Sequence, residues 1–107
     1  MSRVLLVDLE ADLAQRLTAS LEGLGYEVAA GDAVDVIKRL ISDGPELAVV
    51  NLELTQGSGF SLVNRIKRNE ALAGLKLVLV AERATDSAID AHRRGPTPAN
   101  VYARRSE

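Results

Sequence analysis

The chain has no cysteine and no tryptophan, and Tyr26, Phe60 and Tyr102 are its only aromatic residues. Without cysteine it has neither disulfides nor thiolate metal ligands nor a cysteine nucleophile. It also lacks any apolar stretch near the roughly 20 residues that a membrane-spanning helix requires. No signal-peptide segment precedes its first apolar run. We therefore expect a cytoplasmic protein that does not contact membranes.

A large excess of charge of one sign is absent as well. The 13 basic and 15 acidic residues leave a formal net charge of −2, which gives no electrostatic reason to expect nucleic acid as a partner. What the chain does contain is aliphatic side chains, within an apolar content of 47% over 107 residues. That composition is typical of one folded domain whose core is a parallel sheet covered by helices.

Short apolar runs alternate along the chain with segments of helical periodicity. The predicted strands are 4–7, 26–30 (at an edge), 47–50, 76–80 and 100–103. Four helices are predicted between these strands. The first begins at Ala11 and has the apolar positions Leu13, Leu17, Leu21 and Leu24, and the second is capped by Asp32 and has Val34, Ile37, Leu40 and Ile41. The third is capped by Ser58 or Gly59 and has Phe60, Val63 and Ile66, and the fourth extends from Thr85 or Asp86 to His92. This alternation predicts βαβ units, a mostly parallel sheet and helices on both of its faces.

Polar residues follow two of the predicted strands. Asp8-Leu9-Glu10 comes after the first strand and Asn51-Leu52-Glu53 after the third. In open α/β sheets, ligands bind at the carboxyl ends of the strands where the strand order reverses, as in the flavodoxin-like order 2-1-3-4-5. Asn51 is the most informative of these residues, because a polar residue at the tip of a buried strand lies where such sheets carry their chemistry. Its amide can both donate and accept hydrogen bonds there. We expect it to bond to Asp8 or to the loop 52–57.

Four segments of the chain resemble response-regulator receiver domains of the CheY-like superfamily. These segments are 4–8, 21–28, 45–51 and 57–60, and the resemblance extends over almost the whole chain. It implies an α/β, flavodoxin-like, doubly wound parallel sheet with strand order 2-1-3-4-5.

The resemblance also implies a chemistry that this chain has largely lost. In receivers an aspartate becomes an acyl phosphate, neighbouring carboxylates hold Mg²⁺, and a lysine and a hydroxyl contact the phosphoryl group. The positions that correspond are Asp8, Leu9, Asn51, Ala81 and Arg105. Only Asp8 keeps a carboxylate, and an amide is neither a nucleophile nor a good Mg²⁺ ligand.

We therefore expect a degenerate pseudo-receiver, similar to those of bacterial motility and polarity regulators. It would act as a phosphorylation-independent protein-interaction module, not as an enzyme, and would use neither Mg²⁺ nor another cofactor.

One alternative is a phosphoreceiver of a two-component system in which Asn51, natural or engineered, replaces the acceptor aspartate. A more remote alternative is a small nucleotide- or flavin-binding protein, although the 55–59 turn lacks the lysine and the glycine spacing of phosphate loops. Asp8 and Glu53 are weak metal candidates, and a helix cap or a solvated loop acid is the commoner role.

The family's usual docking surface implies a partner face comprising Ala88, Ile89, His92 and Tyr102. His92 is the only imidazole, and with no evident acid–base partner it is expected to be an ordinary helix-surface residue. The last helix of receivers has no counterpart before Glu107. We therefore expect residues 1–107 to be a C-terminally short receiver-like domain of a longer protein. Part of its sheet would be uncovered, which offers a surface for a homodimer or another protein partner.

Overall fold

The computed structural model describes residues 2–54 and 57–105 of the chain. Five parallel strands form one sheet in the order β2-β1-β3-β4-β5, which confirms the predicted flavodoxin-like topology. The strands are β1 (Arg3–Val7), β2 (Glu27–Gly31), β3 (Leu47–Asn51), β4 (Lys76–Ala81) and β5 (Val101–Arg104). The helices are α1 (Ala11–Gly23), α2 (Val36–Asp43), α3 (Gly59–Lys67) and α4 (Asp86–Arg93), with a short 3-10 turn, η1 (Glu70–Leu72).

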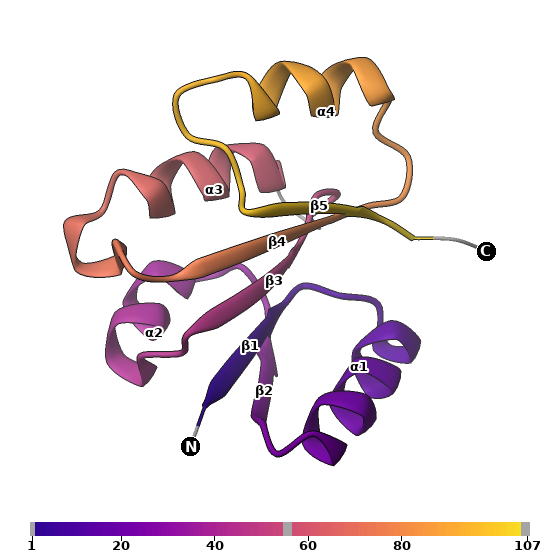
Figure 1. Cartoon of the computed structure of the whole chain (residues 1–107), viewed down its shortest axis with the longest axis vertical. Helices are drawn as coiled ribbons and strands as arrows, with labels where there is room; N and C mark the ends of the chain where they lie inside the picture. The colour runs from indigo at the N-terminus through magenta and orange to yellow at the C-terminus, as the bar shows by residue number, and fades with distance from the viewer. Residues whose placement is uncertain (1, 55–56, 106–107) are drawn as a thin grey trace.

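Strand β1 shows how the two faces of the sheet are covered. Its apolar run from Val4 to Val7 is buried on both faces of the sheet, while Arg3 at its start is exposed. Leu5 and Val7 belong to the larger core under α2, α3 and α4, whereas Val4 and Leu6 pack toward α1. Figure 1 shows α1 on the side of the sheet away from α2 and α3.

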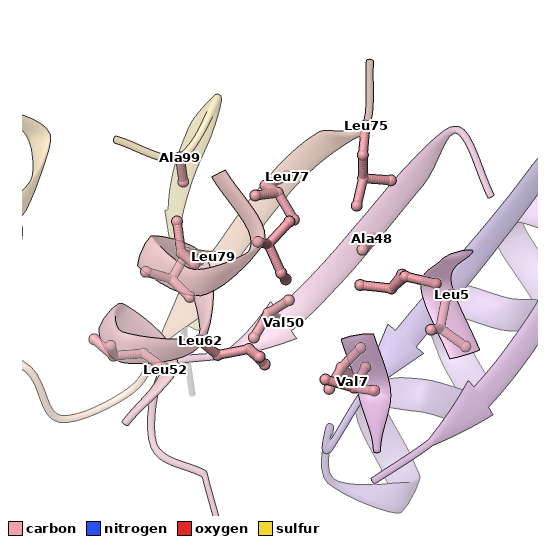
Figure 2. Packing of buried hydrophobic residues seen from close by; sticks show 14 of the residues in the cluster. Leu5, Val7, Ala48, Val50, Leu52, Leu62, Leu75, Leu77, Leu79 and Ala99 are labelled. Atoms are coloured by element: carbon pink, nitrogen blue, oxygen red, sulfur yellow. The ribbon is translucent and has the colours of Figure 1, made fainter. Parts of the chain in front are cut away.

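The larger core is made of aliphatic side chains from neighbouring strands that interdigitate with the helices above them. Figure 2 shows Val50 and Leu79 at its centre, with Leu62 of α3 beside them. Val50 and Leu79 are opposite each other in the β3–β4 register. Burying each such side chain stabilises the fold by about 1.5–3 kcal/mol. The core therefore fixes the sheet on which the loop residues of the site are carried.

Helix α2 begins later than the sequence predicted. Asp32 does not cap it: its carboxylate accepts a 3.0 Å hydrogen bond from the Val34 N–H, which makes a local turn. The capping position is Asp35, a left-handed residue (φ 53°) without a side-chain capping bond. Because the turn delays the helix, Val36 and Leu40 become its buried residues, and Val34 is left 68% exposed.

Two further apolar positions do not face the core as predicted. Leu24 lies beyond α1 and is 75% exposed, and Ile41 of α2 is 49% exposed.

The predicted caps of α3 and α4 are confirmed more closely than that of α2. The Ser58 hydroxyl accepts from the Phe60 N–H, and the Thr85 hydroxyl accepts from the Ala88 N–H. The 3-10 turn η1 was not predicted.

Among the described residues, α1 is the only helix that packs on its face of the sheet. Beside it lies a groove of about 390 Å³ whose walls are mostly aliphatic. Its lining includes Leu13, Leu17 and Leu21 of α1 and Leu47, Val49, Val78, Val80 and Ala103 of the strands. The predicted incompletely covered strip is present, and β5 forms next to it. None of the helices in the described part of the chain is long and apolar enough to cross a membrane.

Candidate functional site

The side chain of Asn51 joins the carboxyl ends of β1 and β3. Its Nδ2 donates a 3.0 Å hydrogen bond to the Asp8 carbonyl oxygen, and its Oδ1 accepts a 3.2 Å hydrogen bond from the Glu53 N–H. The sequence offered a bond to Asp8 or to the following loop as alternatives, and the structure contains both. An aspartate carboxylate can only accept, so it would lose the bond to Asp8.

The backbone of Asp8 is held in an unusual conformation at this tip. Its φ is 55°, in the left-handed region that few residues other than glycine, asparagine and aspartate adopt. Its N–H donates to the Gly31 carbonyl at 2.8 Å, which ties it to β2, while its carbonyl accepts from Asn51. Asp8 is not the cap of α1, because that position is Glu10. The backbone of Asp8 thus links the end of β1 to β2 and, through Asn51, to β3.

Helix α3 approaches the tip of β3 closely at Gly59. Its N–H donates to the Leu52 carbonyl at 2.8 Å. A Cβ atom at this position would lie 2.6 Å from the Leu52 Cα and 2.7 Å from the Asn51 carbonyl oxygen. Only glycine allows this approach without a backbone shift.

Arg105, which the sequence resemblance aligned with a receiver lysine, is turned toward the β1–α1 loop. It follows the last residue of β5, and its backbone N–H donates to the Ala81 carbonyl at 2.8 Å. Its guanidinium forms an ion pair with Glu10. The hydrogen bond and the positive charge of Arg105 hold the pKa of the Glu10 carboxyl below its usual value. The positive charge of Arg105 is therefore neutralised by the Glu10 carboxylate.

A small cavity of about 30 Å³ marks the place where the altered positions meet. Leu9, Asn51 and Arg105 line it, together with Glu10, Leu13, Val80 and Glu82. The structure thus brings three of the five predicted site positions around one cavity.

Ala81 and Asp8 are placed differently. Ala81 is 2% exposed and packs in the larger core, so a methyl group lies where the sequence resemblance implied a hydroxyl. Asp8 contributes the carbonyl that Asn51 binds. No three carboxylate or imidazole side chains converge as a metal site within residues 2–54 and 57–105.

The Glu53 carboxylate binds the loop between β4 and α4, so Glu53 is not simply the solvated loop acid that the sequence suggested as its commoner role. One oxygen accepts from the Glu82 N–H (2.9 Å), and the other accepts from the N–H groups of Arg83 (3.1 Å) and Ala84 (3.0 Å). Burial raises the pKa of the Glu53 carboxyl, but these backbone N–H groups outweigh that effect and lower it overall. The Glu53 carboxylate therefore holds the backbone of the β4–α4 loop.

His92 is part of a polar cluster between α3, α4 and β5, not an ordinary surface residue. Its Nδ1 lies 2.6 Å from the Tyr102 hydroxyl and its Nε2 lies 2.9 Å from the Asn64 Oδ1. Its ring stacks on Phe60, with centroids 4.6 Å apart. Since Asn64 Oδ1 only accepts, the neutral form with the proton on Nε2 satisfies both contacts. Burial lowers the pKa of His92, against an opposing contribution from the Phe60 backbone.

Tyr102 is fixed by the same cluster. Its hydroxyl accepts a 2.9 Å hydrogen bond from the Ala99 N–H, and the Arg93 guanidinium lies 5.1 Å from the centre of its ring. Ile89, predicted on the partner face, is 8% exposed and belongs to the core, because it lies on the inward side of α4. Ala88, His92 and Tyr102 are partly exposed and are consistent with that face.

Sequence reasoning missed Asn64, Thr97 and Arg104. The Thr97 hydroxyl donates to the same Asn64 oxygen that meets His92, and Arg104 binds carbonyls of the β4–α4 loop. The alternation of side chains along a strand could have pointed to Arg104, since it is two residues from Tyr102 and lies on the same face of β5. Nothing comparable in the sequence pointed to Asn64 or Thr97.

A comparison with known proteins finds a relative among motility proteins, whereas no protein-family model matches the chain. Adventurous-gliding motility protein Z of Myxococcus xanthus (strain DK1622) is 34% identical over 101 residues. The match covers 94% of this chain and 7% of that protein. This chain therefore spans only a small fraction of the length of that relative.

Solved structures of receiver domains superpose over nearly the whole chain. The receiver domain of a DNA-binding response regulator from Colwellia psychrerythraea has a TM-score of 0.86 at 20% identity, covering 98% of this chain and 86% of that one. A Vibrio cholerae chemotaxis protein gives 0.83 at 16% identity, covering 100% and 88%. The response regulator TrrA of Thermotoga maritima, in complex with Mg²⁺–BeF, gives 0.80 at 22% identity, covering 99% and 88%. The chain has the fold of response-regulator receiver domains, as the sequence resemblance implied.

Proposed function

We propose that the chain is a pseudo-receiver: a cytoplasmic, non-enzymatic protein-interaction module of bacterial signalling that works without phosphorylation. The observation that carries this proposal is the use of the Asn51 amide. Both of its polar atoms serve the strand tip, one on Asp8 and one on Glu53. The position from which a phosphoryl acceptor would react is thus occupied by a structural hydrogen-bond bridge.

The surroundings of Asn51 support the same function. Arg105 is paired with Glu10, and the cavity they line measures only about 30 Å³. By the sequence resemblance, Leu9 corresponds to an acid that binds Mg²⁺ in receivers, and its side chain has no oxygen to offer. A site with so few and so poorly placed carboxylates is expected to bind Mg²⁺ no better than the millimolar range.

The proposed role in protein–protein interaction is supported by the proteins that this chain resembles. Thermotoga TrrA has also been solved in complex with the histidine kinase ThkA, and its TM-score to this chain in that complex is 0.76. Proteins of this fold therefore meet protein partners. The likeness to a gliding-motility protein supports a partner in motility or polarity signalling.

One experiment distinguishes the pseudo-receiver from the alternative, a phosphoreceiver whose acceptor aspartate has been replaced by Asn51. The natural chain and Asn51→Asp are incubated with Mg²⁺ and acetyl phosphate, and intact masses are measured over time. We expect no adduct on the natural chain and no stoichiometric adduct on Asn51→Asp, because Leu9, Ala81 and Arg105 still lack the Mg²⁺-binding acid, the hydroxyl and the lysine. Stoichiometric phosphorylation of Asn51→Asp would support the alternative, and an adduct on the natural chain would refute the pseudo-receiver.

A second copy of the chain is the proposed occupant of the groove beside α1. The groove is largely aliphatic and measures about 390 Å³, and exposed apolar patches of this kind mark interaction sites. Sedimentation equilibrium is expected to show a dimer that Val78→Arg dissociates. A monomer at all concentrations would exclude this mode of association.

A further inference from the structure

The loop between β4 and α4 is held on two sides by side chains from other elements. The Glu53 carboxylate accepts hydrogen bonds from three consecutive N–H groups, those of residues 82, 83 and 84. The Arg104 guanidinium donates to the carbonyl oxygens of Glu82 (3.4 Å) and Ala84 (2.8 Å). The donors of this loop are thus tied to the β3–α3 connection, and its acceptors are tied to β5.

Successive backbone N–H groups that converge on one point form an anion-binding concavity. Here the anion is a carboxylate of the chain itself. Hydrogen bonds with an ionised partner are roughly twice as strong as neutral ones, and both Glu53 and Arg104 are ionised groups. The loop therefore has a strong internal ligand and needs no external anion to be ordered.

The position of this loop determines how α4 begins. Thr85 follows the loop directly and caps the helix, its hydroxyl accepting from the Ala88 N–H at 3.1 Å. Arg104 also forms a 2.9 Å ion pair with Asp86 in the first turn. At the other end of the helix, His92 contacts Tyr102 and Asn64. Both ends of α4 are thus fastened to the body of the domain.

We propose that Glu53 and Arg104 form a clamp that fixes the β4–α4 loop, and with it the start of α4, in a single conformation. In this arrangement the exposed surface of α4 and β5 is presented permanently, without a ligand to order it. The clamp is a property of the fold and does not depend on how the chain responds to a phosphodonor.

Amide hydrogen exchange followed by NMR tests the clamp on the whole chain. Glu53→Gln keeps the size of the side chain but removes its charge and half of its acceptor capacity. We expect exchange at residues 82–84, and at Ala88 and Ile89 in the first turns of α4, to become at least about tenfold faster. The matched control Glu22→Gln, at an exposed position in α1, is expected to leave these rates within about twofold.

Arg104→Met provides a second and independent variant. It removes the guanidinium from the exposed end of β5 and leaves Glu53 intact, so the same amides are expected to exchange faster. Unchanged rates in both variants would overturn the proposal. Faster exchange at 82–84 with no change at Ala88 and Ile89 would also overturn it, because the clamp would then not reach α4. A uniform acceleration that includes Val49 and Leu79 would show general destabilisation instead, and it too would contradict the clamp.

Discussion

The Nδ2 of Asn51 donates a 3.0 Å hydrogen bond to the backbone carbonyl oxygen of Asp8, and this bond joins the ends of two adjacent parallel strands. The two residues are 43 positions apart in the sequence. In a working receiver the same place holds the reacting carboxylate, as the family resemblance implies. Here it holds a donor that the backbone of the first loop uses.

Replacing Asn51 with aspartate is expected to destabilise the fold. The carboxylate cannot donate to the Asp8 carbonyl and would place a charge beside that oxygen, at a cost of about 1–3 kcal/mol. Urea unfolding measures this loss. The control is Asn69→Asp: Asn69 only accepts, from the Ala71 N–H, and a carboxylate accepts equally well, so its change is expected within about 0.5 kcal/mol. An Asn51→Asp protein as stable as the natural chain would show that the bond to Asp8 is not important.

Gly59→Ala is expected to cost about 1–3 kcal/mol in the free energy of unfolding. The added methyl group would meet the Leu52 Cα at 2.6 Å and the Asn51 carbonyl oxygen at 2.7 Å, and backbone atoms cannot move aside cheaply. Gly74→Ala is the matched control, because a methyl group added there would have no atom within 4 Å apart from its chain neighbours. Equal unfolding midpoints for the two variants would contradict the close approach of α3 to β3.

Tyr102→Phe removes the hydroxyl that accepts from the Ala99 N–H and contacts His92. Since Ala99 is 7% exposed, its N–H would be left buried without this acceptor. We expect a loss of about 1–3 kcal/mol by urea unfolding. Tyr26→Phe, outside this cluster, is the control and is expected to change stability by less than about 0.5 kcal/mol. The contact would be unimportant if the two variants were equally stable.

The stability of the chain is expected to depend on pH through His92. Because its folded-state pKa lies below the unfolded value of about 6.5, the unfolded state binds the proton more readily. The stabilisation is complete above pH 6.5 and is lost as the pH falls through the lower folded-state pKa. Melting temperatures between pH 7.5 and 5 measure this. His92→Gln is expected to flatten the dependence, and an equally steep dependence in that variant would assign it to other groups.

The sequence predicted the sheet well because buried parallel strands are short, continuous apolar runs, and 47–50 is one of them. It placed Leu24, Val34 and Ile41 incorrectly, because helical spacing identifies a stripe but not where the helix starts or which turns extend beyond the core. The two bonds of Asn51 followed from the chemistry of an amide at a strand tip. The bonds of Glu53 did not, because they join segments about 30 residues apart whose relative position depends on the packed sheet.

An NMR titration with Mg²⁺ and beryllofluoride is the sharpest test of the proposed pseudo-receiver, which should neither bind Mg²⁺ with a phosphoryl analogue at Asn51 nor respond to it. Thermotoga TrrA has been solved in complex with Mg²⁺–BeF, so the probe suits a receiver of this fold. For the natural chain we predict no saturable shift of the amide signals of Asn51, Glu82, Arg83 and Ala84. A saturable shift at micromolar Mg²⁺ that extends from Asn51 into α4 would contradict the account.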